Sequence, residues 1–313
     1  MYLSLSESLN FDLGDDLSRR DICIVDRQTD ELTRLTTDRQ MSSPAWSQIG
    51  LQLAWLRAND SVGIWDMTTA KIEYFHSPVQ FHSVHGRLEW SKDGTRIYVQ
   101  GDGAILEIAQ NVFIPLSQPP RSTVDCCATW SSNEGYLAYM EVVREDTNGS
   151  HWQIRVLQDG KAIITGEFET NLDQPLQWST DGTTLAWVAD TSSGSQPPQY
   201  KLALSRVPEN KTTYLATDNV FVAITGIAWS PTGNKIAIRK GDLISILELE
   251  IDMTSSMYHV AAQQNIPLQG TSFGGLSWSP DGKTIAYESS WQPFSHIWLA
   301  VPDDNAQKLL PGQ

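Results

Sequence analysis

The stretch Leu276-Ser277-Trp278-Ser279-Pro280-Asp281-Gly282-Lys283-Thr284-Ile285-Ala286-Tyr287 decides the fold, because related stretches recur earlier in the chain. The earlier copies are LEWSKDGTRIYV from Leu88, ATWSSNEGYLAYM from Ala128, LQWSTDGTTLAWV from Leu176, IAWSPTGNKIAI from Ile227, and a degraded PAWSQIGLQLAWL from Pro44. Each copy has Trp-Ser, then a turn that contains Gly, then an apolar run that alternates with polar residues.

The spacing of these copies predicts the fold class. The repeat tryptophans are separated by 44, 40, 48, 51 and 49 residues; they are Trp46, Trp90, Trp130, Trp178, Trp229 and Trp278. A period in this range is typical of a β-propeller, in which each repeat forms one blade of four antiparallel strands. The Trp-Ser segment ends the first strand, the glycine turn supplies a positive φ, and the alternating run forms the second strand.

The segment before Trp46 predicts an incomplete blade. Asp21 to Asp26 (DICIVD) and Glu31 to Thr36 (ELTRLT) resemble third and fourth strands, and Tyr2 to Ser6 suits a second strand. This arrangement gives seven blades, with residues 1–41 as the partial one and residues 42–313 as six Trp-Ser repeats. The alternative is six blades, if the first segment covers or replaces the weak final strand near Lys308. We expect one domain over residues 1–313.

The motif Trp-Ser-Pro-Asp-Gly-Lys-x-Ile-Ala-Tyr closely resembles the WD40-like repeat of the TolB type, the PD40 repeat. The resemblance extends from Asp21 onward, although Asp30 replaces the Gly that usually ends the family's Asp-x-x-Thr-Gly turn. It implies a β-propeller, and similar proteins often hold a peptide or a partner protein on one face or in the central channel. Trp-Ser is expected to pack between blades, and the Ser and Asp side chains to bond their own turn.

Composition and charge exclude several kinds of partner. The formal net charge is −15, so a nucleic acid backbone would be repelled, and we expect no nucleic-acid binding.

Three cysteines cannot form a disulfide framework. The N-terminus has no export signal, and no apolar stretch is long enough to cross a membrane. The chain as given is therefore expected to be cytoplasmic, or periplasmic or membrane-associated if an upstream segment is missing.

Motifs that suggest chemistry lack the context that the chemistry needs. Gly270 to Gly274 matches the G-x-S-x-G pattern, but the helix that must follow a nucleophile elbow has no place before the strand that ends at Trp278. His76, His82 and His85, with Glu89, lack the spacing of a zinc site. Acidic pairs such as Asp303-Asp304 do not follow a calcium-loop pattern. We therefore predict no catalytic residue, metal or cofactor.

The two long connections between second and third strands, and the histidine segment, are the candidate binding positions. Variable loops at one position of each repeat gather on one face of a propeller, where binding usually occurs. The candidate residues are Glu145, Asp146, Asn148 and His151 in the first connection, Ser192, Ser195, Pro197 and Pro198 in the second, and His82 and His85. These positions predict a non-catalytic scaffold that binds a protein or a peptide.

Two other functions stay open at this point. The chain would serve as an accessory propeller if a separate peptidase or hydrolase chain supplied the active site. It would instead be a propeller enzyme if side chains of the inner strands converged on a substrate. The inner strands offer Glu89, Cys126, Cys127, Thr129, Gln177 and Thr225 for this purpose. The sequence does not determine the partner or the oligomeric state.

Overall fold

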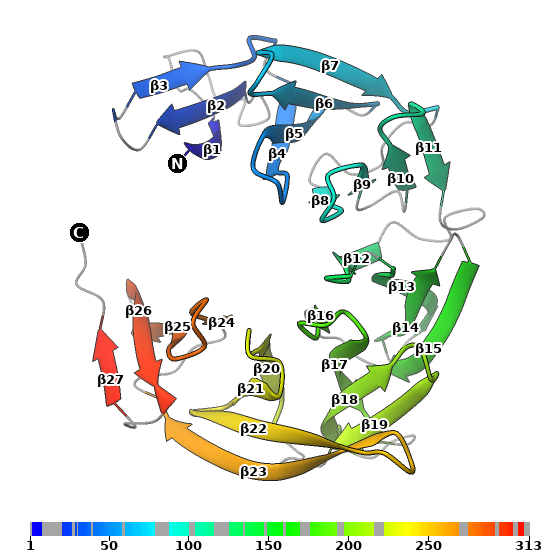
Figure 1. Cartoon of the computed structure of the whole chain (residues 1–313), viewed down its shortest axis with the longest axis vertical. Helices are drawn as coiled ribbons and strands as arrows, with labels where there is room; N and C mark the ends of the chain where they lie inside the picture. The colour runs from blue at the N-terminus through cyan, green and yellow to red at the C-terminus, as the bar shows by residue number, and fades with distance from the viewer. Residues whose placement is uncertain are drawn as a thin grey trace. The chain divides into compact units, whose positions relative to one another are not determined.

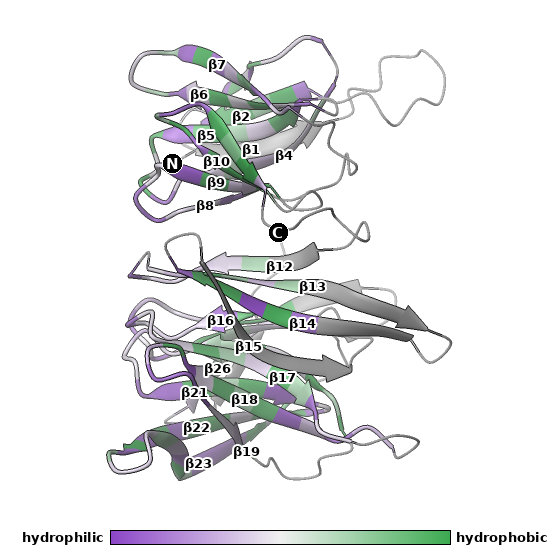
Figure 2. Cartoon of the chain, turned by 90° about the vertical axis from the view of Figure 1, so that its right-hand side faces the viewer, coloured by the Kyte–Doolittle hydropathy of each residue, from purple (hydrophilic) through white to green (hydrophobic). Residues whose placement is uncertain are grey.

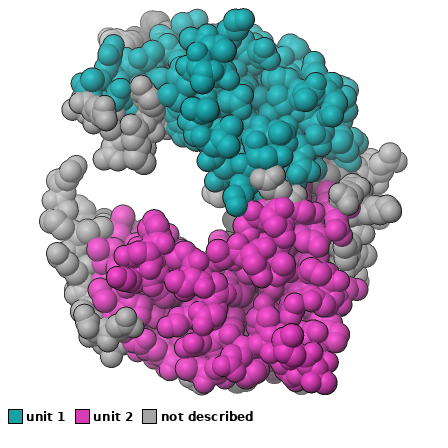
Figure 3. Space-filling view, viewed as in Figure 1, with its two compact units in different colours: residues 1–130 teal, residues 131–313 magenta. Residues whose placement is uncertain are grey.

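The Trp-Ser stretches form the first strands of four-stranded antiparallel sheets, and the runs that follow form the second strands, as the sequence predicts. The computed structural model describes residues 2–7, 21–26, 29, 31–38, 40–57, 60–78, 88–99, 104–115, 125–133, 135–146, 149–158, 161–169, 176–192, 197–215, 222–268, 275–291, 294–302 and 306–309. They belong to two compact units, residues 1–130 and 131–313 (Figure 3). The single domain stays a prediction.

The first unit contains one three-stranded sheet, two four-stranded sheets and one further strand (Figure 1). The three-stranded sheet is made of β1 (Tyr2–Glu7), β2 (Asp21–Asp26) and β3 (Glu31–Arg34). The next sheet is made of β4 (Met41–Trp46), β5 (Gln52–Arg57), β6 (Ser61–Asp66) and β7 (Lys71–His76). The third is made of β8 (Leu88–Trp90), β9 (Arg96–Val99), β10 (Ala104–Glu107) and β11 (Val112–Pro115). The unit ends with β12 (Asp125–Trp130), the first strand of the sheet β12-β13-β14-β15.

The second unit contains the rest of that sheet and three complete four-stranded sheets. It begins with β13 (Leu137–Asp146), β14 (Gly149–Gln158) and β15 (Lys161–Glu169). The complete sheets are β16 (Gln177–Trp178), β17 (Thr184–Asp190), β18 (Tyr200–Arg206) and β19 (Lys211–Leu215); β20 (Ile224–Trp229), β21 (Lys235–Lys240), β22 (Leu243–Asp252) and β23 (Met257–Pro267); and β24 (Leu276–Trp278), β25 (Ile285–Trp291), β26 (Phe294–Val301) and β27 (Ala306–Leu309). The all-β class with four-stranded antiparallel blades is confirmed.

The N-terminal sheet lacks a Trp-Ser strand among the residues that the structure describes. In this sheet Tyr2 pairs with Asp26, and Asp26 pairs with Glu31. In the next sheet the equivalent pairs join the second, third and fourth strands: the first residue of β5 pairs with Asp66, and Asp66 pairs with Lys71. The strand β1 is therefore the counterpart of β5, and β2 and β3 are the counterparts of β6 and β7. The N-terminal sheet therefore has the second, third and fourth strands that were predicted for the partial blade. With it, the number of sheets is seven.

The turn after each Trp-Ser is held by its own side chains, as expected. The Ser179 hydroxyl donates to Asp181 Oδ1 at 2.5 Å, and the same oxygen accepts the N–H of Thr183 at 3.0 Å. Gly182 has a φ of +69°, which glycine adopts without the strain that a side chain would bring. Its N–H closes the turn on the Ser179 carbonyl at 2.9 Å. Equivalent Ser to Asp bonds occur in the turns that contain Asp93 and Asp281.

The repeat tryptophans connect each sheet to the one before it. Four indole N–H groups donate to a main-chain carbonyl of the preceding repeat's first strand, and in each case the acceptor is the residue just before the earlier tryptophan. The pairs are Trp90 to Ala45 at 2.9 Å, Trp130 to Glu89 at 3.2 Å, Trp229 to Gln177 at 3.3 Å and Trp278 to Ala228 at 3.0 Å. For these four residues the prediction that Trp-Ser packs between blades is confirmed, and they are architectural.

Hydrophobic cores lie between neighbouring sheets. In the first unit Leu56 and Val62 of one sheet pack with Ile97 and Leu106 of the next. In the second unit the sheet β16 to β19 shares one core with the sheet β20 to β23, and the latter shares another with the sheet β24 to β27. Figure 2 shows these apolar stretches in green along the strands. Complete burial of one aliphatic side chain contributes about 1.5–3 kcal/mol, so these cores are the main source of stability.

The structure corrects one predicted loop and adds one strand. Glu145 and Asp146 end β13, and His151 lies in β14, so the connection predicted from Glu145 to His151 is the end of a long β-hairpin. The other addition is β23, an 11-residue strand that the sequence analysis did not identify. It pairs along the whole of β22, with a register shift between Glu248 and Leu249.

Candidate binding surface

The hairpin of β22 and β23 continues beyond its register shift to a polar turn. We call residues 249–260 the hairpin tip. The Asp252 carboxylate orders the turn, because its Oδ1 accepts the N–H of Thr254 at 2.7 Å and that of Ser255 at 3.4 Å. The Thr254 N–H, followed by the Ser255 groups, holds the pKa of Asp252 below its ordinary value. Ser256 adopts a φ of 58°, in the left-handed region that such a turn requires.

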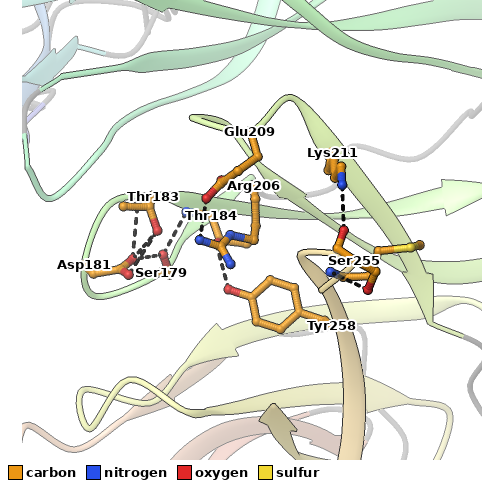
Figure 4. A network of polar contacts seen from close by, with 10 residues as sticks. Ser179, Asp181, Thr183, Thr184, Arg206, Glu209, Lys211, Ser255 and Tyr258 are labelled. Atoms are coloured by element: carbon orange, nitrogen blue, oxygen red, sulfur yellow. Dashed lines mark hydrogen bonds and ion pairs between the residues drawn. The ribbon is translucent and has the colours of Figure 1, made fainter. Parts of the chain in front are cut away.

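Three hydrogen bonds hold the hairpin tip against the neighbouring sheet of the same unit, and Figure 4 shows two of them, between Tyr258 and Thr184 and between Lys211 and Ser255. The Tyr258 hydroxyl lies 2.8 Å from Thr184 Oγ1, and the Tyr258 N–H donates to Thr213 Oγ1 at 3.1 Å. Lys211 Nζ donates to the Ser255 carbonyl at 2.7 Å. The tip therefore rests on the edge strand β19 and reaches the first residue of β17.

The charged groups beside this contact are engaged with one another. Arg206 and Glu209 form an ion pair of 2.6 Å in the turn that precedes β19. Burial by itself raises the pKa of Asp181, but hydrogen bonds from Ser179 and Thr183 outweigh it, and the pKa lies below its usual range. Burial raises the pKa of Tyr258, and the bond to Thr184 opposes that change. This network supports the hairpin tip, and its geometry fits a structural role better than a catalytic one.

Apolar side chains are exposed on the hairpin tip itself. Met257 precedes the half-buried Tyr258 and is 42% exposed, and Met253 in the turn is 89% exposed. We call Met253 and Met257 the methionine patch. Because hydrogen bonds hold the strands beneath it, the patch is presented on a fixed support.

A second candidate position is Glu89, in the middle of β8. Leu88 and Trp90 on either side are buried, so the Glu89 side chain points to the other face of the strand. Burial raises the pKa of this carboxyl to about 7. The main-chain carbonyl of the same residue accepts the Trp130 indole N–H, so the position of Glu89 is fixed by the blade architecture. A carboxyl that titrates near neutral pH is able to exchange a proton under ordinary conditions.

The structure describes some of the predicted binding residues. Asp190 Oδ1 accepts the N–H groups of Ser192 and Gln199, each at 2.9 Å, and so draws together the two ends of the segment between them. Pro197 and Pro198 are exposed within this segment. Glu145, Asp146 and His151 are described by their backbone only, and His82, His85, Asn148 and Ser195 lie outside the described residues. Whether these positions bind a partner stays a prediction.

The other chemical candidates from the sequence are described only in part. Within the described ranges no group of three or more His, Cys, Asp or Glu residues is placed to hold a metal ion. The G-x-S-x-G segment, residues 270–274, lies outside them, as do the side chains of Cys126 and Cys127. Thr225 has a buried hydroxyl that lacks a hydrogen-bond partner in the part of the chain that is described. In that same part, no helix has the length and apolar character that crossing a membrane requires.

The methionine patch was missed by sequence analysis. Its support depends on β23, whose exposed residues include Gln263 and other polar side chains, so the strand lacks a strong β-forming composition. The available signal was the alternation of Ile-Leu-Glu-Leu-Glu-Ile-Asp before a turn-forming Asp-Met-Thr-Ser-Ser segment, residues 246–256. That pattern is typical of a long hairpin.

Comparison with known proteins establishes the class of the fold. No family model and no curated protein matches the chain. Among solved structures it is similar to an oligogalacturonate lyase from Vibrio parahaemolyticus, with 10% identity over 92% of this chain and 85% of that chain, and a TM-score of 0.58. An oligogalacturonate lyase in complex with manganese gives 11% identity over 91% and 84%, with a TM-score of 0.56. These enzymes are β-propellers, so the chain has a β-propeller fold.

A resemblance to TolB is also present. TolB from Acinetobacter baumannii shares 14% identity over 95% of this chain, with a TM-score of 0.48, and this chain spans 60% of the TolB chain. That likeness is too weak to support an argument about function. The β-propeller class is thus established, while the assignment of the repeats to the PD40 type stays a prediction.

Proposed function

We propose that this protein is a non-catalytic β-propeller that binds a protein or peptide partner, acting as a subunit or interaction module. The observation that supports the proposal is the methionine patch. Single exposed apolar residues are common on protein surfaces, but these two methionines lie four residues apart on one hairpin tip that hydrogen bonds hold in place. Methionine adapts to irregular partner surfaces.

The test is co-purification from the native source with a matched control. The Met253→Ser/Met257→Ser variant removes the apolar side chains without changing the charge. The Val112→Ser/Ile114→Ser variant removes two exposed apolar side chains, 48% and 42% exposed, from the edge strand β11. We expect the partner to be recovered with the unchanged protein and with the control, and lost with the methionine variant. Equal recovery with both variants would contradict the proposal.

The identity of a recovered partner distinguishes the scaffold from the accessory propeller. Mass spectrometry of the co-purified chain shows whether it is a peptidase or another hydrolase. In that case the present chain would still bind through the methionine patch, and the active site would belong to the partner.

A propeller enzyme is the second candidate function, and Glu89 is the observation that favours it. A carboxyl with a pKa near 7 suits general acid or base catalysis. The test is a broad screen for hydrolase and lyase turnover with the unchanged protein and with Glu89→Gln. We expect no turnover that depends on Glu89, and a robust activity abolished by Glu89→Gln would replace the binding proposal.

A further inference from the structure

The methionines of the chain differ sharply in their access to solvent. Met41 is 2% exposed and Met140 is 1% exposed, whereas Met253 is 89% exposed and Met257 is 42% exposed. Met67 is half-buried. Among the methionines that the structure describes, the thioether groups open to a dissolved reagent are therefore concentrated on the hairpin tip.

An exposed thioether is a reactive group as well as an apolar one. Hydroperoxides oxidise methionine to methionine sulfoxide, which is polar where the thioether is apolar. With hydrogen peroxide, the sulfur lone pair attacks one oxygen, the O–O bond breaks and an S–O bond forms. The departing hydroxide takes the proton of the transferred oxygen and leaves as water. The sulfur loses two electrons, and the peroxide gains them.

The bonds that hold the hairpin tip do not involve the two sulfur atoms. They join the Tyr258 hydroxyl to Thr184, the Tyr258 N–H to Thr213, and Lys211 to the Ser255 carbonyl. An oxygen added to either exposed sulfur removes none of these bonds. Oxidation of the methionine patch would therefore change the chemistry of the surface and leave its support in place.

Met41 shows what burial does to the same chemistry. It lies in the core that contains Ile22 and Trp55. A sulfoxide there would bury a polar group in apolar surroundings, which is costly. Burial also keeps a dissolved oxidant away from the sulfur, so peroxide should reach Met253 and Met257 before it reaches Met41.

We propose that Met253 and Met257 form a redox modification site, at which hydroperoxides convert both side chains to sulfoxides and so release the bound partner. The release rests on the proposed function, since the methionine patch is the surface that holds the partner. A sulfoxide buried in an interface loses its hydrogen bonds to water, which weakens binding. Thiol-dependent methionine sulfoxide reductases reverse the step: the sulfoxide oxygen leaves as water, and two thiols become a disulfide.

The first measurement follows oxidation of the full chain by hydrogen peroxide with peptide mass spectrometry over time. We expect Met253 to react first and Met257 next, both at least about tenfold faster than Met41 and Met140. The same reaction in urea is the control, because unfolding should bring all of these rates together. The oxidised protein should keep its unfolding temperature. Equal rates at exposed and buried methionines in the folded chain would overturn the inference.

The second measurement is partner recovery before and after peroxide treatment. The matched control is Met253→Leu/Met257→Leu, which keeps two apolar side chains and removes the sulfur atoms. We expect oxidation to lower recovery by the unchanged protein about tenfold and to leave recovery by the leucine variant unchanged. Reductases for the two sulfoxide epimers should restore recovery by the oxidised protein.

The failures of the inference and of the proposed function are distinguishable. Equal recovery by oxidised and unoxidised protein would overturn the release, as would an equal loss from the leucine variant, because the oxidation that matters would then lie elsewhere. Both results leave the proposed function standing. If the unoxidised protein recovers no partner, the proposed function fails and the release fails with it, while the oxidation rates still decide whether the hairpin tip is a modification site.

Discussion

Replacing Glu89 with Gln should stabilise the protein increasingly as the pH rises. Burial raises the pKa of this carboxyl from its ordinary value of 4.5 to about 7 in the folded chain. Between these values the folded protein keeps the proton and the unfolded chain releases it. Stability is therefore lost as the pH rises from 4.5 to 7, and the loss is complete above pH 7. Gln has no charge to desolvate, so the variant escapes this loss.

The size of the effect follows from the two pKa values. Each pH unit between them corresponds to 1.36 kcal/mol, so the full difference in the free energy of unfolding is about 3 kcal/mol at pH 8. At pH 5 most of the loss has not yet occurred, and the variant should be more stable by about 1 kcal/mol. These are upper figures, because the Glu89 side chain keeps some contact with water.

Urea unfolding at pH 5 and pH 8, followed by tryptophan fluorescence, measures this difference. Asp66→Asn is the matched control. Hydrogen bonds from Thr68 and Thr69 lower the pKa of the exposed Asp66 to about 2, so it stays ionised over this range. Asp66→Asn should destabilise the protein equally at both pH values. A Glu89→Gln effect that is equal at pH 5 and pH 8, or smaller at pH 8, would refute the reasoning.

Three further predictions concern the supports of the fold. Tyr258→Phe removes the bond to Thr184 and should lower the free energy of unfolding by about 1 kcal/mol, with no additional loss when Thr184→Val is combined with it; chemical unfolding of the single and double variants checks this. Gly63→Ala would place a Cβ 2.5 Å from the fully buried Trp55 ring, and should lower the unfolding temperature through a loss of about 1–3 kcal/mol, measured by calorimetry. Asp190→Ala should speed proteolytic cleavage between residues 191 and 199 relative to the unchanged protein, because both ends of that segment lose their acceptor; mass spectrometry of limited digests locates the cut.

The Trp-Ser turns were predictable because their chemistry is local. Ser179, Asp181 and Gly182 lie within four residues, and their hydrogen bonds and positive φ need nothing from outside the turn. The run that follows was predictable as a strand from its composition, although the structure buries both of its faces: all residues from Thr184 to Ala189 of β17 are buried. The N-terminal partial sheet was predictable as well, because Asp21 to Asp26 has the composition of a third strand.

The hairpin lengths were not predictable from the same local signals. Polar residues from Glu145 to His151 suggested a loop, although the Asn148-Gly149 pair within them is also a common hairpin sequence. The β23 strand is stabilised by contacts such as the one between Tyr258 and Thr213, which are 45 residues apart in the chain. A pattern within one repeat carries no information about such a contact. The methionine patch depends on that contact and was missed for the same reason.

The indole contact explains how a constant architecture leaves room for function on the first strands. It uses a main-chain carbonyl, so the side chain of the acceptor residue is free to vary. Neighbouring side chains on a strand point to opposite faces. The side chain of the acceptor residue therefore lies on the face opposite to the repeat tryptophan that directly follows it in the sequence. The residues at this position in the six repeats are Ala45, Glu89, Thr129, Gln177, Ala228 and Ser277. Only one of them is ionisable, and it is held by the bond to Trp130 in a setting that raises its pKa to about 7. Two departures from the repeat, a Trp46 donor that lacks a partner among the described residues and a Glu89 carboxyl whose pKa is raised, occur on consecutive first strands of one unit.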